Sequence, residues 1–365
     1  MKVVLAFDSF KGTMSSLEVA RIVENKLVNK YSDIIVATLE IGDGGEGTLN
    51  AIINQTGGEK RFKRIIGPHF EEVEAPVGII GDTCFIESAS VVGFKYKKAS
   101  DTPSNISTYG IGELIKYALD LNMKNIYVCM GGTTSTDGGC GMASSLGVKF
   151  YNQKGKEFIP MGISLNEIVD IDTSGIDKRL KSVNIYALSD VTNPLFGKMG
   201  ASFVYGPQKG ASIEEVAIMD EGLINLDNIL SKKYHLNNAT YPGAGAAGGL
   251  GYGLISFLGA KIEKGIEVIL DLLHFNDIIK DADIIFTGEG RLDSQSFQGK
   301  VVDGILKRSK NKCLIGIFGI IDENVNIPHE FKKVYEINTK HLPFEDIKNN
   351  AKADLEKLVE IIDLY

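Results

Sequence analysis

Residue types that bind anions gather in one stretch of the chain, Gly131 to Gly141. The five apolar residues before it (126–130) predict a buried strand, and the run after it (142–146) is compatible with a helix. A strand that leads through glycines into a helix start presents backbone N–H groups beside the positive end of the helix dipole. The stretch therefore predicts an anion-binding loop whose candidate contacts are Gly131, Gly132, Thr133, Thr136 and Asp137.

A simple turn with an N-cap would use the same residue types as this loop. Such a turn needs one or two glycines, whereas this loop has five, Gly131, Gly132, Gly138, Gly139 and Gly141. We therefore favour a ligand-binding loop over a turn that serves the fold alone.

Charged and polar residues also follow the other apolar runs that predict strands. They are Asp8, Ser9 and Lys11; Asp43, Gly44, Gly45 and Glu46; Glu87 and Ser88; Asp190 and Asn193; and Gly288, Glu289, Arg291 and Asp293. Open parallel α/β sheets bind ligands at the carboxyl ends of their strands. Carboxylates there suit Mg²⁺, while lysine, arginine and backbone N–H groups suit phosphoryl oxygens.

Two of the cations are interpreted individually. Lys11 lies between Asp8-Ser9 and Gly12 just before a predicted helix, so we expect it to meet a phosphate at that helix start. Arg291, flanked by Glu289 and Asp293, has two interpretations of equal weight. It is either a salt-bridged clip within its loop or a bidentate grip on a substrate carboxylate or phosphate.

The familiar phosphate and catalytic motifs do not account for these residues. The chain has no GxxxxGK[ST] sequence, and the five histidines have no metal-binding spacing. The segment 243–248 matches GxGxxG, but Pro242 and a polar segment precede it where a dinucleotide site requires a buried strand. Close packing and the approach of an adenine ring are equal alternatives for this segment. No GxSxG elbow supports a serine nucleophile.

The composition narrows the class of protein further. At 365 residues the chain exceeds one ordinary core, so two domains are expected. The net charge of −8 argues against general nucleic-acid binding. Four scattered cysteines fit a reducing cytoplasm, and the N-terminal apolar run is too short for a secretory signal. Residues 239–260 are uncharged but hold seven glycines, so they do not predict a membrane span.

The order of predicted elements indicates a doubly wound α/β domain built from both chain ends. The beginning alternates strands (2–7, 34–39) with helices (Ser15 as N-cap to Lys30, and 48–55). The end alternates strands (282–287, 312–318, 334–337) with helices (299–309, 344–362). Between them, short strands (73–77, 83–87, 183–188) and helices (112–121, 213–234) predict a mixed sheet.

We therefore predict an α/β protein of two domains. A Rossmann-like or flavodoxin-like doubly wound domain comprises residues 1–65 and 281–365, and an inserted mixed α/β domain comprises residues 66–280.

Long motifs in a fixed order resemble the type I glycerate kinases almost from end to end. They are DSFKG (8–12), DGGEGT (43–48), STYGIGELI (107–115), GGTTSTDGGCGM (131–142), SDVTNPLFG (189–197), FVYGPQKGA (203–211), PGAGAAGGLG (242–251) and TGEGRLDSQSFQGK (287–300). The resemblance implies ATP-dependent phosphorylation of D-glycerate in the cytoplasm, with 2-phosphoglycerate as the favoured product. It also implies an active-site cleft between two α/β domains. Thr136 replaces the asparagine that this family commonly has in its glycine loop.

On this kinase hypothesis, Mg²⁺ and ATP are the cofactors, and a carboxylate positions or deprotonates the attacking hydroxyl. Asp190 is our choice as base or metal ligand, with Asp43, Glu46, Glu289 and Asp293 as alternatives; Asp43 and Asp293 are the candidate metal ligands. Lys11 neutralises phosphoryl charge and Arg291 binds the glycerate carboxylate. The Gly131–Gly141 loop meets either that carboxylate or a phosphate of ATP.

Two other hypotheses stay open at this point. One is a kinase for another small hydroxy acid, and the other is a two-domain protein that binds a small anion without chemistry. We expect small-molecule partners only, neither nucleic acid nor membrane, and a monomer or homodimer.

Overall fold

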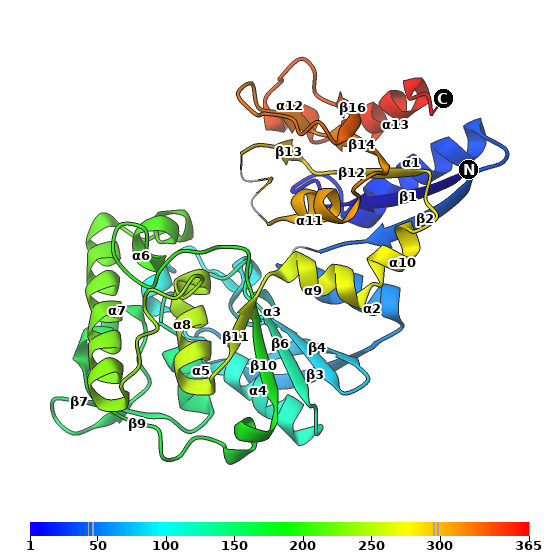
Figure 1. The fold of residues 1–365 in the computed structure, drawn as a ribbon. Helices are drawn as coiled ribbons and strands as arrows, with labels where there is room; N and C mark the ends of the chain where they lie inside the picture. Colours follow the sequence, from blue (N-terminus) through cyan, green and yellow to red (C-terminus); the bar gives the residue numbers. More distant parts are fainter. Residues whose placement is uncertain (43, 46, 295, 298, 365) are drawn as a thin grey trace. The chain divides into compact units, whose positions relative to one another are not determined.

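The structure is a computed structural model that describes residues 1–42, 44–45, 47–294, 296–297 and 299–364. The chain divides into two compact units. Unit 1 comprises Met1–Asp43, Asn50–Thr56 and Gly265–Tyr365, and unit 2 comprises Gly44–Leu49 and Gly57–Lys264. Both units combine helices with a sheet of largely parallel strands, so the predicted α/β class is confirmed (Figure 1).

Unit 1 is built on a five-stranded sheet in which all neighbouring strands are parallel. Its spatial order is β16-β14-β12-β1-β2. The strands are β1 (Lys2–Phe7), β2 (Ile35–Glu40), β12 (Ile284–Gly288), β14 (Cys313–Phe318) and β16 (Phe331–Glu336). Counted in chain order this is 2-1-3-4-5, the flavodoxin-like doubly wound order, whose direction reverses between β1 and β12.

Helices cover both faces of this sheet. On one face α1 packs beside α13, and their apolar residues share a core with Val3, Leu5 and Phe7 of β1. Side chains alternate across a strand, so Val4 and Ala6 point to the opposite face, where α11 contacts β1 and β12. The helices of unit 1 are α1 (Ser16–Lys30), α9 (Gly265–Leu272), α10 (Phe275–Ile279), α11 (Val301–Arg308), α12 (Phe344–Ile347) and α13 (Ala351–Ile361), with α2 (Thr48–Thr56) beginning in unit 2.

The predicted start of α1 is confirmed in detail. Ser15 is the N-cap, and its hydroxyl accepts a hydrogen bond from the backbone N–H of Glu18 at 3.2 Å. The Glu18 carboxylate accepts in return from the backbone N–H of Ser15 at 2.9 Å. This capping box satisfies two N–H groups that the helix itself leaves unpaired.

The predicted closing helix 344–362 is corrected by the structure, which has two helices there, α12 and α13. Residues 348–350 form a turn between them. The reason lies in Asn349 and Asn350, since asparagine is a weak helix former that favours caps, and Asn350 is the N-cap of α13.

Unit 2 is built on a six-stranded mixed sheet of order β11-β10-β6-β5-β4-β3. The strands β5, β6, β10 and β11 are parallel to one another, while β3, β4 and β5 are antiparallel neighbours. The strands are β3 (Glu59–Ile66), β4 (Glu72–Ile80), β5 (Thr83–Glu87), β6 (Asn125–Cys129), β10 (Asn184–Leu188) and β11 (Lys261–Glu263). The mixed sheet expected for the middle of the chain is thus present.

The helices of unit 2 cover this sheet and carry the glycine-rich segments. They are α3 (Ala89–Val92), α4 (Tyr109–Asp120), α5 (Cys140–Ser145), α6 (Ala201–Tyr205), α7 (Ile213–Tyr234) and α8 (Ala246–Leu258), with 3₁₀ turns at Phe94–Tyr96, Pro103–Asn105, Gly162–Glu167, Lys178–Ser182 and Pro207–Lys209. The bounds of α7 are those predicted. Two small sheets complete the fold: β7 (Lys149–Asn152), β8 (Glu157–Phe158) and β9 (Ile168–Asp172) in unit 2, and β13 (Arg291–Leu292) with β15 (Ile320–Ile321) in unit 1.

Candidate active site

The loops after β1, β12, β14 and β16 are joined side by side at the carboxyl edge of the unit 1 sheet. The N–H of Asp8 donates to the carbonyl of Gly288 at 2.9 Å, and the N–H of Gly319 donates to the carbonyl of Glu289 at 3.1 Å. Further along, the N–H of Asn338 donates to the carbonyl of Gly319 at 2.9 Å. These bonds hold four loops in fixed positions around the point where the strand order reverses, which is where doubly wound sheets bind ligands.

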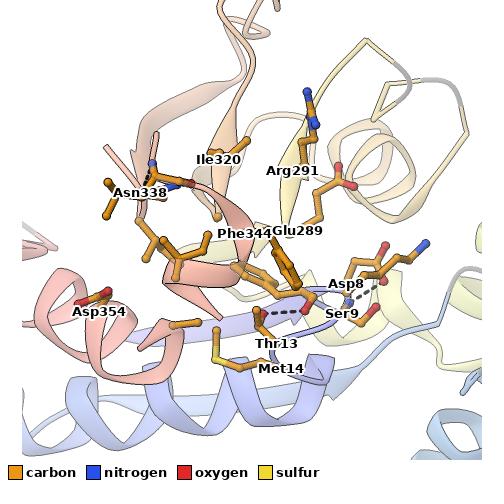
Figure 2. Close-up of a pocket in the computed structure, with 18 of the residues that line it drawn as sticks. Asp8, Ser9, Thr13, Met14, Glu289, Arg291, Ile320, Asn338, Phe344 and Asp354 are labelled. Atoms are coloured by element: carbon orange, nitrogen blue, oxygen red, sulfur yellow. Dashed lines mark hydrogen bonds between the residues drawn. The ribbon is translucent and has the colours of Figure 1, made fainter. Parts of the chain in front are cut away.

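A cavity of about 710 Å³ opens at this position and is lined entirely by residues of unit 1. Its volume falls within the range of roughly 300–1,000 Å³ typical of small-molecule sites. Figure 2 shows Asp8 and Ser9 on the right of the cavity and Asp354 on the left, with Glu289 and Phe344 between them. Charged side chains line one part of it: Asp8, Lys11, Glu289, Arg291, Asp293 and Lys300.

Asp8 and Lys11 come from the loop after β1, as predicted from the sequence. Asp8 is buried, and one of its carboxylate oxygens accepts from the backbone N–H of Ser9 at 2.6 Å. Lys11 is exposed at the rim of the cavity. Gly12, next to Lys11, has φ +82°, so the loop turns in a conformation that glycine adopts most easily.

Glu289 is the most buried carboxylate of the β12 loop, with 9% of the residue exposed. Among the described residues, its buried Oε1 atom has no hydrogen-bond partner. Burial raises the pKa of Glu289, opposed by a hydrogen bond from Ser296 and by the positive charges of Lys300 and Lys11. A buried carboxylate oxygen that lines a cavity together with two lysines suits a cation or a hydroxyl donor.

The other members of the β12 loop are partly engaged within the protein. The Asp293 carboxylate accepts from the N–H of Ser296 at 3.2 Å, and the Arg291 guanidinium donates to Asp322 at 2.9 and 3.2 Å. This pair with Asp322 raises the pKa of Arg291. Arg291 therefore forms a salt bridge with the loop after β15 and not within its own loop, and a substrate anion would have to compete with this exposed ion pair.

Lys300 completes the charged part of the cavity. The sequence indicated it only as the last residue of the motif 287–300, without a role of its own. Lys300 is the N-cap residue of α11, so the positive end of that helix begins at a residue that lines the cavity and carries a positive charge. The combination favours an anion, in particular a phosphate. The signal in the sequence was a lysine directly before an apolar helix start.

The rest of the cavity contains the charged residues Lys340 and Asp354 but is lined mainly by apolar side chains, most of them from the segment after β16. They are Phe10, Met14, Ile320, Ile337, Leu342, Pro343, Phe344, Ile347 and Ala351. This apolar segment was not predicted to contribute to a site, because its residues match the ordinary pattern of a helix that packs on a sheet.

In unit 2 the predicted anion loop follows β6, and its Asp137 is completely buried. The carboxylate accepts from the N–H and the hydroxyl of Thr108 at 2.8 and 2.7 Å, and from the N–H groups of Gly139 and Gly141 at 3.0 and 3.2 Å. Burial raises the pKa of Asp137, and these four hydrogen bonds lower it. In this structure the carboxylate therefore ties the loop to the start of α4.

Several N–H groups of the same loop donate to carbonyl groups of neighbouring segments. Thr134 donates to Val92 at 2.8 Å, Thr136 to Pro103 at 3.0 Å and Gly138 to Gly248 at 3.1 Å. These three N–H groups are consequently not free for an anion. The roles predicted for Gly131, Gly132, Thr133, Thr136 and Asp137 as ligand contacts stay predictions.

Lys209 is a buried charged residue that sequence reasoning did not single out. Only 4% of it is exposed, and its Nζ atom donates to the carbonyl of Ser135 in the glycine loop at 2.7 Å. Burial lowers the pKa of Lys209 to about 7, opposed by the charge of Asp137. Its neighbours Gly206, Pro207 and Gly210 predict a turn, but nothing in that pattern indicates that the side chain points inward.

The remaining candidates follow β10 of unit 2 and β2 of unit 1. Asp190 and Asn193 follow β10, and the amide of Asn193 donates to the carbonyl of Met199 at 2.8 Å. Gly44 donates to the hydroxyl of Thr48 at 3.0 Å, and a Cβ added at Gly131 would lie 2.6 Å from the Cα of Gly45. Asp43 and Glu46 lie outside the described residues.

The GxGxxG segment is a packing surface in the structure. Added Cβ atoms would lie 2.1 Å from the carbonyl oxygen of Pro194 at Gly245 and 2.0 Å from that of Ser135 at Gly248. Gly248 and Gly249 have φ +70° and +85° inside α8. Close backbone contact therefore explains these glycines. The described residues directly before Gly243, from 235 to 242, form coil and turn and not the strand that a dinucleotide fingerprint requires.

The carboxylates of the cavity fit a metal ion that needs few protein ligands. Within the described ranges, no three histidine, cysteine, aspartate or glutamate side chains are grouped to hold a metal ion. Mg²⁺ commonly takes only one or two carboxylates and completes its shell with waters and phosphates. Asp8, Glu289 with its unpartnered Oε1, and Asp293 line one cavity and fit that more modest requirement.

Comparison with known proteins identifies the class that this fold and site define. The model of the glycerate kinase family matches residues 3–364. A glycerate 2-kinase of Escherichia coli (strain K12) is 41% identical over 335 residues, covering 90% of this chain and 88% of its own. A glycerate kinase of Bacillus cereus is 39% identical over 363 residues, covering 98% and 95%.

A solved structure shares the fold as well as the sequence. It comes from Salmonella typhimurium LT2, where it is assigned provisionally as glycerate kinase 2, and it is 37% identical with a TM-score of 0.84. The match covers 99% of this chain and 96% of that one. The protein therefore belongs to the glycerate kinase family, whose members are phosphotransferases. The resemblance inferred from the motifs is confirmed.

The search for membrane-spanning segments gave a negative result. None of the helices in the described part of the chain combines the length and the apolar character needed to cross a bilayer.

Proposed function

We propose that the protein transfers the γ-phosphoryl group of ATP to D-glycerate, with Mg²⁺ bound to the nucleotide and 2-phosphoglycerate as the favoured product. The observation that carries the proposal is the cavity at the reversal point of the unit 1 sheet. Its lining combines Lys11 and Lys300 with the carboxylates of Asp8, Glu289 and Asp293. Membership of the glycerate kinase family supports the reaction type and the acceptor.

The chemistry requires positioning and charge neutralisation more than a covalent nucleophile. A hydroxyl oxygen of glycerate forms a bond to the γ-phosphorus, the bond from that phosphorus to the bridging oxygen breaks, and ADP leaves. The hydroxyl proton passes to a carboxylate. Carboxylates such as Asp8, Glu289 and Asp293 would hold Mg²⁺, which would help to neutralise the charge of the phosphate oxygens.

Residue roles in this proposal follow the residue types. Lys11 and Lys300 neutralise the phosphate oxygens, and Asp8, Glu289 and Asp293 are the carboxylates available to the metal. Asp190 is proposed as the base or as a metal ligand, and Arg291 as the grip on the glycerate carboxylate in place of its pair with Asp322.

The direct test is ADP release by the purified protein, measured with ATP, Mg²⁺ and D-glycerate together and with each omitted in turn. We expect release only when all three are present, and loss of release on chelation of the metal. ³¹P NMR of the product identifies the phosphorylated hydroxyl. A panel of other small hydroxy acids tests the acceptor, and ADP release that does not depend on any acceptor would contradict the proposal.

Variants test the individual roles. Asp190→Asn is expected to lower kcat by about 100-fold or more because general-base assistance is typically worth that much. Asp170→Asn, an exposed carboxylate that pairs with Lys233, is the matched control and should leave kcat unchanged. Near-normal kcat in Asp190→Asn would rule out Asp190 as the base.

Arg291→Ala should raise the KM for glycerate. An unchanged KM would mean that Arg291 serves only its ion pair with Asp322.

A further inference from the structure

The unit 1 cavity has two parts of different chemistry. The charged part lies at the ends of β1 and β12, where Lys11 and Lys300 share the cavity with carboxylates. The other part is lined mainly by Met14, Ile337, Leu342, Phe344, Ile347 and Ala351, beside the charged residues Lys340 and Asp354. A ligand that fills both parts must combine charged groups at one end with a flat or apolar group at the other.

The apolar part contains large side chains that remain exposed in this structure. Leu342 is 45% exposed and Phe344 is 48% exposed, although both line the cavity. Exposed apolar surface inside a concave site is stabilised when a ligand covers it, and an aromatic ring favours a second flat ring. Side chains that only held α12 against the sheet would be expected to be more completely buried.

The segment that carries these side chains is held in place before any ligand binds. The Asn338 amide accepts from the N–H of Leu342 at 3.1 Å and donates to its carbonyl at 3.0 Å, which closes the loop between β16 and α12. The Phe344 ring packs against Gly12 so closely that an added Cβ would lie 2.7 Å from the ring. A preformed surface costs little entropy when the ligand binds.

Size separates the two substrates of the proposed reaction. D-glycerate has about seven non-hydrogen atoms and no apolar surface, whereas a nucleoside triphosphate has about thirty and carries a flat base, which suits a cavity of this class. The charged part of the cavity alone would accommodate glycerate, and the apolar part would then have no occupant.

We infer that the unit 1 cavity binds the phosphoryl donor, with the adenine base on the ring of Phe344 and beside Leu342. The triphosphate then extends toward Lys11 and Lys300. This inference rests on the proposed function for the identity of the donor. It assigns the nucleoside to unit 1, a choice that the sequence left open between the glycine-rich loops.

The test compares Phe344→Ala and Leu342→Ala with Phe344→Tyr and the control Phe62→Ala. Phe62 is a 54% exposed aromatic residue on β3, outside the cavity, so it matches Phe344 in exposure. Stacking of a base on an aromatic side chain is worth about 1–3 kcal/mol, so Phe344→Ala should raise the KM for ATP by about tenfold. Its kcat and its KM for D-glycerate should stay within about twofold, and Phe344→Tyr should restore the KM for ATP, since tyrosine keeps the ring.

Binding without chemistry separates this inference from the proposed function. Titration calorimetry with ATP, and with adenosine alone, should show weaker binding of both to Phe344→Ala and Leu342→Ala and unchanged binding to Phe62→Ala. If the protein shows no glycerate-dependent ADP release but these binding losses appear, the proposed function fails and the nucleoside site stands. If the kinase is active and Phe344→Ala alters the KM for glycerate while ATP and adenosine bind normally, the nucleoside site is wrong.

Discussion

At the scale of single residues, the buried Lys209 helps to hold the glycine loop in its conformation. Its ammonium group has been removed from water and donates to the carbonyl of Ser135, while Asp137 holds the other side of the same loop with four accepted hydrogen bonds. Removing a charge from water is costly, so a buried lysine persists only where its donors are engaged. Lys209 is therefore a positioning residue for the loop.

The lowered pKa of Lys209 predicts how stability changes with pH. Burial lowers the pKa from 10.5 to about 7, so between pH 7 and 10.5 the unfolded chain binds a proton that the folded protein does not. The free energy of unfolding then rises with pH across this window, by at most about 5 kcal/mol. Below pH 7 both states are protonated, and this contribution stays constant.

Lys209→Met removes this contribution, so the wild-type protein should gain stability relative to the variant as pH rises from 7 to 9.5. Urea unfolding at several pH values measures the difference. Lys198→Met, at an exposed lysine of the same unit, should keep a constant difference from the wild type. Parallel curves for Lys209→Met and the wild type would contradict the prediction.

At the scale of elements, the contact between Gly12 and Phe344 joins the β1 loop to α12. Two constraints meet at Gly12, because its φ of +82° is strained for other residues and its missing Cβ makes room for the ring. The short helix α12 contributes Phe344 and Ile347 to the cavity. Its position therefore depends on a glycine more than 300 residues earlier in the chain.

Gly12→Ala should accordingly destabilise the protein by about 1–2 kcal/mol from backbone strain and displace Phe344 as well. We expect a higher KM for ATP in addition to a lower urea midpoint. Gly81→Ala is the matched control, since Gly81 has φ +58° but no atom within 4 Å of an added Cβ. It should lose a similar amount of stability and keep the wild-type KM. An unchanged KM in Gly12→Ala would show that the contact is dispensable.

Most of the elements were predictable from the sequence because their patterns are local. Strand β1 is a continuous apolar run, and α1 begins with a serine and a glutamate three residues later. The charged half of the cavity was predictable for the same reason, since Asp8, Lys11 and Glu289 directly follow strands. The apolar half was not predictable, because Leu342 and Phe344 line a cavity only where the fold brings the distant loop at Gly12 next to them.

The burial of Lys209 and the pairing of Arg291 with Asp322 could not be predicted either. Both depend on partners that are far away along the chain, and neither lysine nor arginine carries a local signal for its partner. The predicted domain limits at residues 65 and 281 and the roles of Asp190 and Asn193 stay predictions.

At the scale of the whole molecule, the cavity belongs to unit 1, which supplies every residue of its lining. A ligand that binds only the folded state stabilises it by RT ln(1 + [L]/Kd), which is about 2.7 kcal/mol at 100 times the dissociation constant. The elements that contact the ligand should show the largest decrease in local opening.

Hydrogen exchange should therefore report which unit binds the donor. With Mg²⁺ and ATP at 100 times the dissociation constant, amides of β1 and β12 are expected to exchange up to about 100-fold more slowly. Amides of β6 and β10 in unit 2 should change little. D-glycerate alone should leave the segment 338–347 unprotected. Equal protection of both units by ATP, or protection of 338–347 by glycerate alone, would contradict the assignment of the donor to unit 1.

The sheet of unit 1 also affects how the protein can fold while it is being synthesised. Strand β1 pairs with β12, and the N–H of Lys2 bonds to the carboxylate of Asp283, across 281 positions of sequence. The first two strands emerge early and can pair with each other, but β1 lacks its second neighbour, β12, until most of the chain has been synthesised. Unit 2 emerges complete in the meantime, and contacts this distant in sequence close slowly. Strand β1 is consequently expected to keep an unpaired edge in the nascent chain until β12 emerges, and an unpaired edge is where chaperones or aggregation would act first.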